Sequence, residues 1–292
     1  MRLFGGLGNQ LFQYALGRNL SLNHKVPLSF DLSGFEPRSG VTQRQFALAP
    51  FNLPATIATP KTIAALTAKG LPAWVRPFWR RVERRLPLRW RRTIMESRRT
   101  FQAEVLQAEA NVYVSGYWQE ERYFAAVAAQ VREDIIRRRT FAGGLGELAQ
   151  EIERTRAVSV HVRRGDYVKS AATAGTHGSC SNEYYAKAER WIEERLGGPR
   201  YFVFSDDIGW ASKHLALRHP AVFVSGRFQQ PEHVDLWLMS LCRHHLIANS
   251  SFSWWGAWLG EQPGSVIVAP RQWFAPTAGR VDSPVPDRWV KV

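Results

Sequence analysis

Cysteine is scarce in this 292-residue sequence, where only Cys180 and Cys242 occur. Their spacing differs from that of the CxxC pairs in metal and redox sites. Two cysteines cannot build the disulfide framework that stabilises small secreted domains, so we expect ordinary thiols in a reducing compartment. A chain of this length buries a full hydrophobic core without covalent crosslinks.

Long hydrophobic runs are missing as well. No stretch approaches the roughly 18 apolar residues of a membrane-spanning helix. The N-terminal residues MRLFGGLGNQ contain a glycine pair after four residues, which interrupts the apolar run that a signal peptide needs. The sequence therefore predicts a cytoplasmic protein.

Acidic residues are the minority among the charged side chains. The chain has 25 Asp and Glu residues against 39 Lys and Arg residues, and its formal net charge is +14. Lysine occurs only seven times, so arginine supplies the other 32 basic residues. This excess of positive charge indicates an anionic partner, which could be nucleic acid, a phosphorylated small molecule or an anionic membrane. A basic surface that is simply solvated also accounts for the charge.

Strand and helix patterns alternate in the second half of the chain. Short runs rich in β-branched and aromatic residues predict strands at 158–162, 201–204, 221–224, 245–248 and 265–270. Helical patterns lie near 183–196 and 233–242, and a Trp-rich helix follows 249–251. Strands that alternate with helices predict a parallel sheet covered by helices on both faces.

The first half repeats this pattern less regularly. Its expected elements are a short strand at 2–4, a helix at 10–22, strands at 26–30 and 111–118, and a helix near 121–137. We therefore expect two α/β domains, residues 1–150 and residues 151–292. Residues 72–100, which are dense in arginine and tryptophan and broken by prolines, are expected as an insertion in the first domain.

The loop GGLGNQ, which starts at Gly5, lies between an expected strand and an expected helix. Such loops present backbone N–H groups to phosphate. However, Leu11 occupies the third glycine position of GxGxxG, and the Lys-Ser/Thr pair of a P-loop is absent, so neither fingerprint is complete. Such glycines more often mark a plain turn, whereas the amides Asn9 and Gln10 favour a functional loop.

The segment SVHVRRGDYV, residues 159–168, places charged residues directly after an expected strand. Ligands bind beyond the carboxyl ends of strands in parallel sheets, and the arginine fork matches phosphate oxygens. Arg163 is therefore a candidate phosphate ligand, and Asp166 would orient one of the arginines. The alternative is an ion pair of Arg164 with Asp166 and a core position for His161.

Polar residues also follow the next strands. Asp206 and Asp207 end YFVF, where a carboxylate would accept hydrogen bonds from a guanine edge or from ribose hydroxyls, or would cap a helix. Asn249, Ser250 and Ser251 end another strand and open a helix, which suits both capping and phosphate binding.

Together these motifs resemble those of the inverting α-1,2-fucosyltransferases of the bacterial type, glycosyltransferase family 11, which are related to plant, animal and nodulation fucosyltransferases. The resemblance covers nearly the whole chain and includes GGLGNQLFQYALGRNL, GYWQEERYF, HVRRGDYV, YFVFSDD, LIANSSFSWWGAWL and PDRWVKV, in the family's order and spacing. The family usually has a longer strand before the glycine loop, where this sequence has four residues. We therefore expect either a shortened first strand or a chain that starts further upstream.

The resemblance implies a GT-B fold, in which two Rossmann-like domains face each other across a cleft and the C-terminal domain holds the donor nucleotide. It implies transfer of L-fucose from GDP-β-L-fucose to the 2-hydroxyl of a galactosyl glycan, with inversion and with no required metal or cofactor. The acceptor would be a free oligosaccharide or a lipid-linked glycan. Another nucleotide sugar remains an alternative donor.

Matching positions imply roles for individual residues. Arg163 would hold the donor pyrophosphate with support from Arg164. The guanine and ribose would contact His161, Asp206 and Asp207, while a loop of Ser250, Ser251 and Phe252 closes on the nucleotide. Gly8 and Asn9 would face the same cleft, and Tyr117, Trp118 and Gln119 would shape the acceptor side. By residue type Asp166 and His161 are both candidates for a general base, and the sequence does not choose between them.

The Arg/Trp-rich block raises two further possibilities. Between Trp74 and Arg99 there are ten arginines against two acids, with aromatic residues among them. A nucleic-acid-binding protein is the alternative from another class, but the ordered strand-end motifs lie outside this block and argue against it. Peripheral contact with an anionic membrane is the second possibility. Its alternative is a subdomain whose tryptophans pack against the N-terminal domain.

Overall fold

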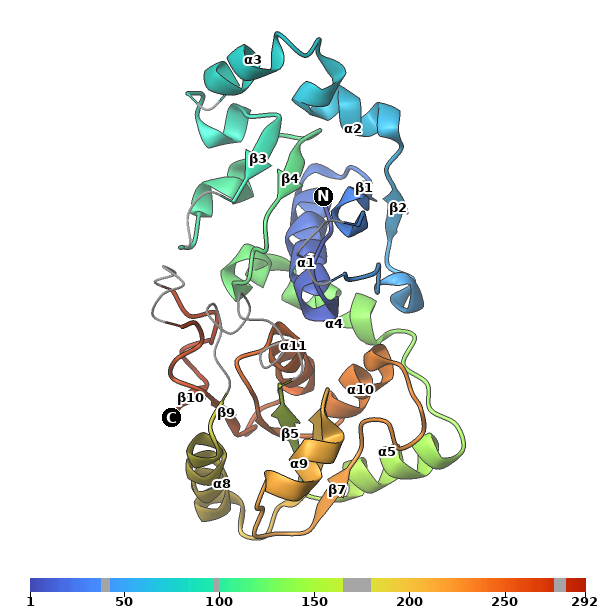
Figure 1. The fold of residues 1–292 in the computed structure, drawn as a ribbon, viewed down its shortest axis with the longest axis vertical. Helices are drawn as coiled ribbons and strands as arrows, with labels where there is room; N and C mark the ends of the chain where they lie inside the picture. The colour runs from blue at the N-terminus through green and yellow to red at the C-terminus, as the bar shows by residue number, and fades with distance from the viewer. Residues whose placement is uncertain (38–42, 84, 97–99, 165–179, 276–281) are drawn as a thin grey trace. The chain divides into compact units, whose positions relative to one another are not determined.

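The computed structural model of the protein describes the chain except for residues 38–42, 84, 97–99, 165–179 and 276–281. The described residues form two compact units, the N-terminal unit Met1–Arg138 and the C-terminal unit Arg139–Val292 (Figure 1). Both units combine helices with parallel strands, which confirms the predicted α/β class. Among the described helices, none has the length and apolar character needed to cross a bilayer.

The N-terminal unit contains α1, Leu7–His24, which is buried along most of its length and exceeds the predicted helix at both ends. Two pairs of parallel strands accompany it: β1 (Leu28–Phe30) with β2 (Ala55–Ile57), and β3 (Thr93–Met95) with β4 (Tyr113–Ser115). The other helices of this unit are α2 (Pro60–Leu66), α3 (Arg76–Glu83) and α4 (Ala128–Ile136).

The first residues of the chain link the two strand pairs. The Arg2 amide donates to the Val114 carbonyl at 2.9 Å, and the Leu3 amide donates to the Asp31 carbonyl at the same distance. The strand predicted at 2–4 is thereby reduced to a single bridge between Arg2 and Asp31. These contacts tie the start of the chain to β1 and β4.

The helix predicted near 121–137 is wrong in its first half. Two short 3₁₀ turns precede α4 because Phe124 and Val127 have φ values of −139° and −122°, outside the helical range. The Asn19 side chain donates to the Tyr123 carbonyl at 2.8 Å and holds the chain in this turn. The 3₁₀ helices are Ser33–Phe35, Ala49–Phe51, Ala68–Gly70, Leu88–Trp90, Ala103–Gln107, Glu121–Tyr123 and Ala125–Val127.

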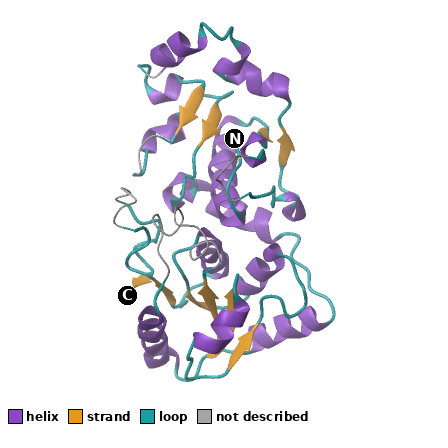
Figure 2. Cartoon of the chain, in the orientation of Figure 1, coloured by secondary structure: helices purple, strands orange, loops and turns teal. Residues whose placement is uncertain are grey.

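The C-terminal unit is built on a six-stranded, fully parallel sheet in the order β10-β9-β8-β5-β6-β7. Its strands are β5 (Ala157–Val162), β6 (Arg200–Ser205), β7 (Ala221–Phe223), β8 (His244–Leu246), β9 (Ile267–Ala269) and β10 (Val290–Lys291). Its helices are α5 (Gly144–Arg154), α8 (Asn182–Leu196), α9 (Ile208–His214), α10 (Glu232–Met239) and α11 (Ser251–Gly260). Figure 2 shows these helices around the strands.

Both faces of this sheet are buried, as the apolar strand runs predicted. Tyr201 and Val203 of β6 point into a cluster with α8 and α9, whereas Phe202 and Phe204 point into a second cluster with α5 and α10. The alternation follows from the two-residue period of a strand. Because every strand is parallel, all the carboxyl ends lie along one edge of the sheet.

Candidate active site

The carboxyl edge of the C-terminal sheet brings three predicted residues together. In the register of β5 and β6, Val162 pairs with Ser205, so the residues after them emerge side by side. Arg163 Nη1 lies 3.1 Å from Asp206 Oδ2, and the Arg164 backbone N–H donates to Asp206 Oδ1 at 2.9 Å. Asp206 therefore holds the start of the loop that follows β5.

This contact gives the arginine pair a positioning partner 43 residues further along the chain. The sequence had suggested Asp166 for that role, but Gly165 and Asp166 lie outside the described residues. Arg163 and Asp206 are about one-fifth exposed, at 20% and 23%. A guanidinium that is partly dehydrated and held by a carboxylate is preorganised to receive a second anion.

Asp207 has the capping role that the sequence left open. Its Oδ1 accepts a hydrogen bond from the Trp210 amide at 3.1 Å, at the first turn of α9. The Arg164 guanidinium lies 4.1 Å from the Trp210 ring centre, and its Nε is 3.8 Å from Asp207 Oδ2. Trp210 was not predicted from the sequence, because a capping aspartate three residues earlier predicts only that its amide donates a hydrogen bond and not that its ring packs on Arg164.

His161 is the buried histidine of the predicted set. Its side chain lies at the end of β5, and its ring centre is 5.4 Å from that of Phe252 in α11. Burial lowers the pKa of His161 to about 3, since the nearby Asp206 offsets only part of the dehydration cost. Its Nδ1 has no hydrogen-bond partner among the described residues. A neutral imidazole with this pKa is a weak base at neutral pH.

The N-terminus of α11 lies at the same edge of the sheet, since β8 pairs with β5 in parallel. Ser250 occupies the cap position, but its side chain makes no capping hydrogen bond. The helix starts at Ser251, and its first turn presents backbone N–H groups with a partial positive charge. Asn249 is instead tied into the core, where its Nδ2 donates to the Trp273 carbonyl at 3.3 Å.

In the N-terminal unit, the glycine loop and the residues after β4 lie together. Gln119 Nε2 donates to Asn9 Oδ1 at 2.6 Å. Gln13 Nε2 donates to the Gly116 carbonyl at 3.1 Å, which links α1 to the segment after β4. Gly5 has a φ of 81°, a left-handed conformation that favours glycine at the turn into α1. Gly8 is buried in the first turn of α1.

The three predicted acceptor-side residues differ in exposure. Tyr117 is 43% exposed, whereas Trp118 is fully buried and packs edge-on against Tyr123 at 5.3 Å. The Glu96 carboxylate accepts hydrogen bonds from the Tyr117 and Trp118 amides at 2.7 and 3.3 Å. Trp118 therefore supports this segment from the core, and Glu96 is a positioning residue that the sequence analysis missed.

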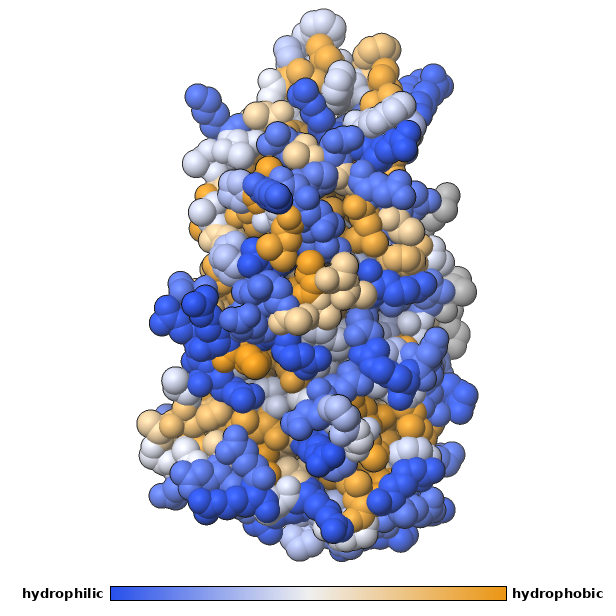
Figure 3. All heavy atoms as spheres, turned by 180° about the vertical axis from the view of Figure 1, so that it is seen from behind, coloured by the Kyte–Doolittle hydropathy of each residue, from blue (hydrophilic) through white to orange (hydrophobic). Residues whose placement is uncertain are grey.

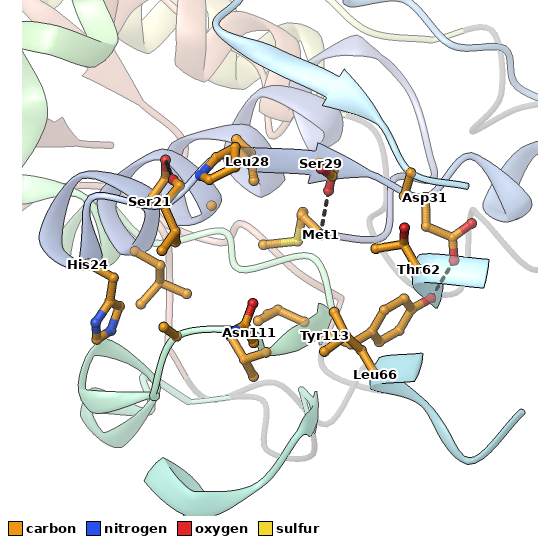
Figure 4. A pocket seen from close by; sticks show the side chains of 18 of the residues that line it. Met1, Ser21, His24, Leu28, Ser29, Asp31, Thr62, Leu66, Asn111 and Tyr113 are labelled. Atoms are coloured by element: carbon orange, nitrogen blue, oxygen red, sulfur yellow. Dashed lines mark hydrogen bonds between the residues drawn. The ribbon is translucent and has the colours of Figure 1, made fainter. Parts of the chain in front are cut away.

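A separate cavity of about 280 Å³ lies within the N-terminal unit. Figure 4 shows His24 and Asp31 near its two ends, with the Tyr113 hydroxyl donating to Asp31 at 2.5 Å. Its lining includes Leu28 and Leu66 but none of the predicted site residues. In the described parts of the chain, no three His, Cys, Asp or Glu side chains are grouped so as to hold a metal ion.

Comparisons with known proteins bear on the whole chain. A family model described as Glycosyl transferase family 11 matches residues 93–290. The alpha-1,2-colitosyltransferase of Escherichia coli is 35% identical over 295 residues, which cover 100% of this chain and 97% of the relative. The O-antigen biosynthesis glycosyltransferase WbnK of Escherichia coli is 32% identical over 295 residues, 94% of each chain.

A crystal structure of POFUT1 in complex with GDP-fucose aligns with 90% of this chain and 95% of its own, with a TM-score of 0.39 and 12% identity. The family assignment rests on the sequence matches. They confirm the resemblance that the ordered motifs indicated, and the chain belongs to glycosyltransferase family 11.

Proposed function

We propose that this protein transfers L-fucose from GDP-β-L-fucose to the 2-hydroxyl of a galactosyl glycan, with inversion at the anomeric carbon. Two findings support the proposal. The protein belongs to family 11, and it resembles transferases whose names specify α-1,2 transfer or galactoside fucosylation. The observation that carries the chemistry is the Arg163–Asp206 pair at the carboxyl edge of the parallel sheet.

The proposed reaction is a displacement. The acceptor O2 forms a bond to the anomeric carbon while the bond from that carbon to the diphosphate oxygen breaks, and GDP leaves with the electron pair. The sugar passes through an oxocarbenium-like state. Arg163 would stabilise the growing charge on the diphosphate, and the N–H groups at the start of α11 would contribute a second favourable field.

The acceptor proton needs a route that does not depend on His161, because a pKa near 3 disfavours proton uptake at that ring. His161 fits a neutral role beneath the nucleotide, next to Phe252. A GT-B arrangement of the two units and a reaction without metal are parts of this proposal. So is a cytoplasmic location, which is consistent with two free cysteines, one of them fully buried.

A colitosyl donor is the second candidate, because the colitosyltransferase is similar over the full length of this chain. Colitose is L-fucose without its 3-hydroxyl group, so the same diphosphate chemistry serves both sugars. A site that hydrogen-bonds the 3-hydroxyl of fucose would disfavour the deoxy sugar strongly, since a polar group of the protein would be left without a partner.

Initial rates with the two GDP sugars test this choice. We expect a higher kcat/KM with GDP-fucose and only weak transfer from the deoxy donor. A higher kcat/KM with GDP-colitose would assign the second function. Stabilisation by UDP but not by GDP in a thermal-shift experiment would contradict both candidates, because only a ligand that prefers the folded state raises the unfolding temperature.

A further inference from the structure

Several large apolar side chains near α3 are exposed to solvent. Trp74 is 83% exposed, Phe78 69% and Trp90 55%. Such side chains are usually largely buried, and a cluster of them on the surface marks an interaction site. The alternative was that the tryptophans of this block pack against the rest of the unit. Trp79, at 38% exposed, is the one that does so in part.

The local backbone fixes where these side chains lie. A turn at Pro72 leads into α3, and Trp74 stands in that turn. Phe78 and Val82 are four residues apart on α3, so they share one helix face. Glu83 is buried and accepts a hydrogen bond from the Thr93 amide at 2.8 Å, which anchors α3 to β3.

The acidic and basic side chains of residues 72–100 differ in their surroundings. The two acids of this block are both engaged by backbone amides, since Glu83 accepts a hydrogen bond from the Thr93 amide and Glu96 accepts one from the Tyr117 amide. The arginines with a described exposed side chain are Arg81, Arg85, Arg89 and Arg92. The neighbouring 3₁₀ helix Ala103–Gln107 and the turn after it add two exposed acids, Glu104 and Glu109, against these four arginines. The surface as a whole remains basic.

We name this region the α3 surface and define it by its apolar members Trp74, Phe78, Val82, Leu86 and Trp90 and its basic members Arg81, Arg85, Arg89 and Arg92. Figure 3 shows hydrophobic and hydrophilic side chains side by side at the end of the N-terminal unit that carries α2 and α3. The Arg89 guanidinium lies 4.9 Å from the Trp90 ring centre, so the two kinds of side chain are in contact.

We propose that the α3 surface docks on an anionic lipid bilayer. Tryptophan and phenylalanine favour the boundary between headgroups and acyl chains, and arginines beside them attract anionic headgroups. Exposed aromatic residues also stack on single-stranded nucleic acid. Val82 and Leu86 cannot stack on bases but insert readily among acyl chains, so the mixture favours lipid.

This proposal does not rest on the sugar donor or on the chemistry of the candidate active site. It assigns a second surface, built entirely within the N-terminal unit. Docking would bring the protein to the surface on which a lipid-linked glycan is displayed. Activity on a soluble acceptor therefore has to persist when docking is removed, which separates failure of this proposal from failure of the proposed function.

Vesicle co-sedimentation of the full chain tests the proposal. The vesicles are phosphatidylcholine alone and phosphatidylcholine with about 30% phosphatidylglycerol, because the expected attraction comes from anionic headgroups. We expect binding at least tenfold tighter on the anionic vesicles. Raising the salt from about 0.1 M to about 1 M shortens the Debye length from about 10 Å to about 3 Å and should release the protein.

Two double variants separate the apolar and the basic contributions. Trp74→Ser with Phe78→Ser should weaken binding to anionic vesicles at least tenfold, because the inserted rings are lost. Arg81→Gln with Arg85→Gln should weaken it severalfold and reduce its salt dependence. All four positions are exposed, so the unfolding temperature and the transfer rate on a soluble galactoside should stay unchanged.

Matched controls use sites away from the α3 surface. Arg137→Gln with Arg138→Gln removes the same charge from exposed positions at the end of the same unit, and Phe228→Ser removes an exposed ring from the C-terminal unit. Neither should change vesicle binding by more than a small factor. A charge variant at 137 and 138 that weakened binding as much as the one at 81 and 85 would overturn the assignment to this surface.

Three other outcomes would also overturn the proposal. The first is absence of binding to anionic vesicles at low salt, and the second is equal binding to neutral and anionic vesicles. The third is a protein that does not bind vesicles but forms a concentration-dependent dimer or binds a single-stranded oligonucleotide, and loses that binding in the double variant Trp74→Ser with Phe78→Ser. That result would assign the α3 surface to a second copy of the chain or to nucleic acid.

Discussion

Replacing Arg163 by alanine should reduce transfer far more than it reduces stability. The ion pair with Asp206 is partly exposed, at 20% and 23% of the two side chains, and pairs of this kind contribute at most about 1 kcal/mol to folding. For a chain of 292 residues, that amounts to a fall of at most about 2 °C in the unfolding temperature.

The expected loss of activity is larger because the donor diphosphate would face the truncated side chain. Removing one partner of a desolvated charge pair costs about 2–5 kcal/mol, and each 1.36 kcal/mol corresponds to about a tenfold change in rate. We therefore expect kcat/KM for the GDP sugar to fall by a factor of about 30 to several thousand. The assay is the initial rate of transfer to a soluble galactoside, beside a thermal melt.

A matched control lies at the opposite end of the same strand. Arg156 immediately precedes β5 and donates to the Gly197 carbonyl at 2.9 Å, away from the carboxyl edge. Arg156→Ala should leave kcat/KM unchanged within a small factor. A folded Arg163→Ala variant that retains a third or more of the wild-type rate would show that Arg163 does not hold the diphosphate, and an equal loss in Arg156→Ala would show that the effect is not specific to the carboxyl edge.

Three further predictions concern pH, stability and metal ions. Burial lowers the pKa of His245 to about 3, so this residue leaves stability unaffected above about pH 6.5 and reduces it as the pH falls toward 3. Thermal melts should show the unfolding temperature declining as the pH falls. The decline should be smaller in His245→Asn but unchanged in His214→Asn, which replaces an exposed histidine. An equal decline in both variants would contradict the prediction. Tyr14 donates to Asp134 at 2.5 Å, so Tyr14→Phe should lower the urea-derived unfolding free energy by about 1–3 kcal/mol, and an unchanged value would show that this bond contributes nothing. Transfer should continue in excess EDTA because the arginines neutralise the diphosphate, and a loss that Mg²⁺ restores would contradict this.

Local pattern predicted the C-terminal sheet well and the helices around it less completely. The strands β5 and β6 were readable because both faces are buried, which leaves continuous apolar runs. The helix α5 was not predicted, although Leu145, Leu148, Ala149 and Ile152 follow a helical period; the expected domain boundary after residue 150 falls within it. The short α9 offers only seven residues, too few for a clear period.

The partner of Arg163 could not be read from local sequence. Asp206 reaches Arg163 through the register of two strands that are far apart in the chain. Asp166, which was predicted to orient one of the arginines, lies outside the described residues, so that role stays a prediction. The burial of Trp118 could not be predicted from local sequence either. The family resemblance implies an acceptor-side role for Trp118, which stays a prediction, whereas its burial against Tyr123 is set by tertiary packing that the motif does not reveal.

The most direct test of the proposed function is the structure of the product formed from GDP-β-L-fucose and a galactoside. Nuclear magnetic resonance identifies both the linkage and the anomeric configuration. We expect an α-linked fucose on O2 of galactose, with one GDP released for each transfer. A β-linked product, a linkage to another hydroxyl, or transfer from a UDP sugar but not from a GDP sugar would contradict this expectation.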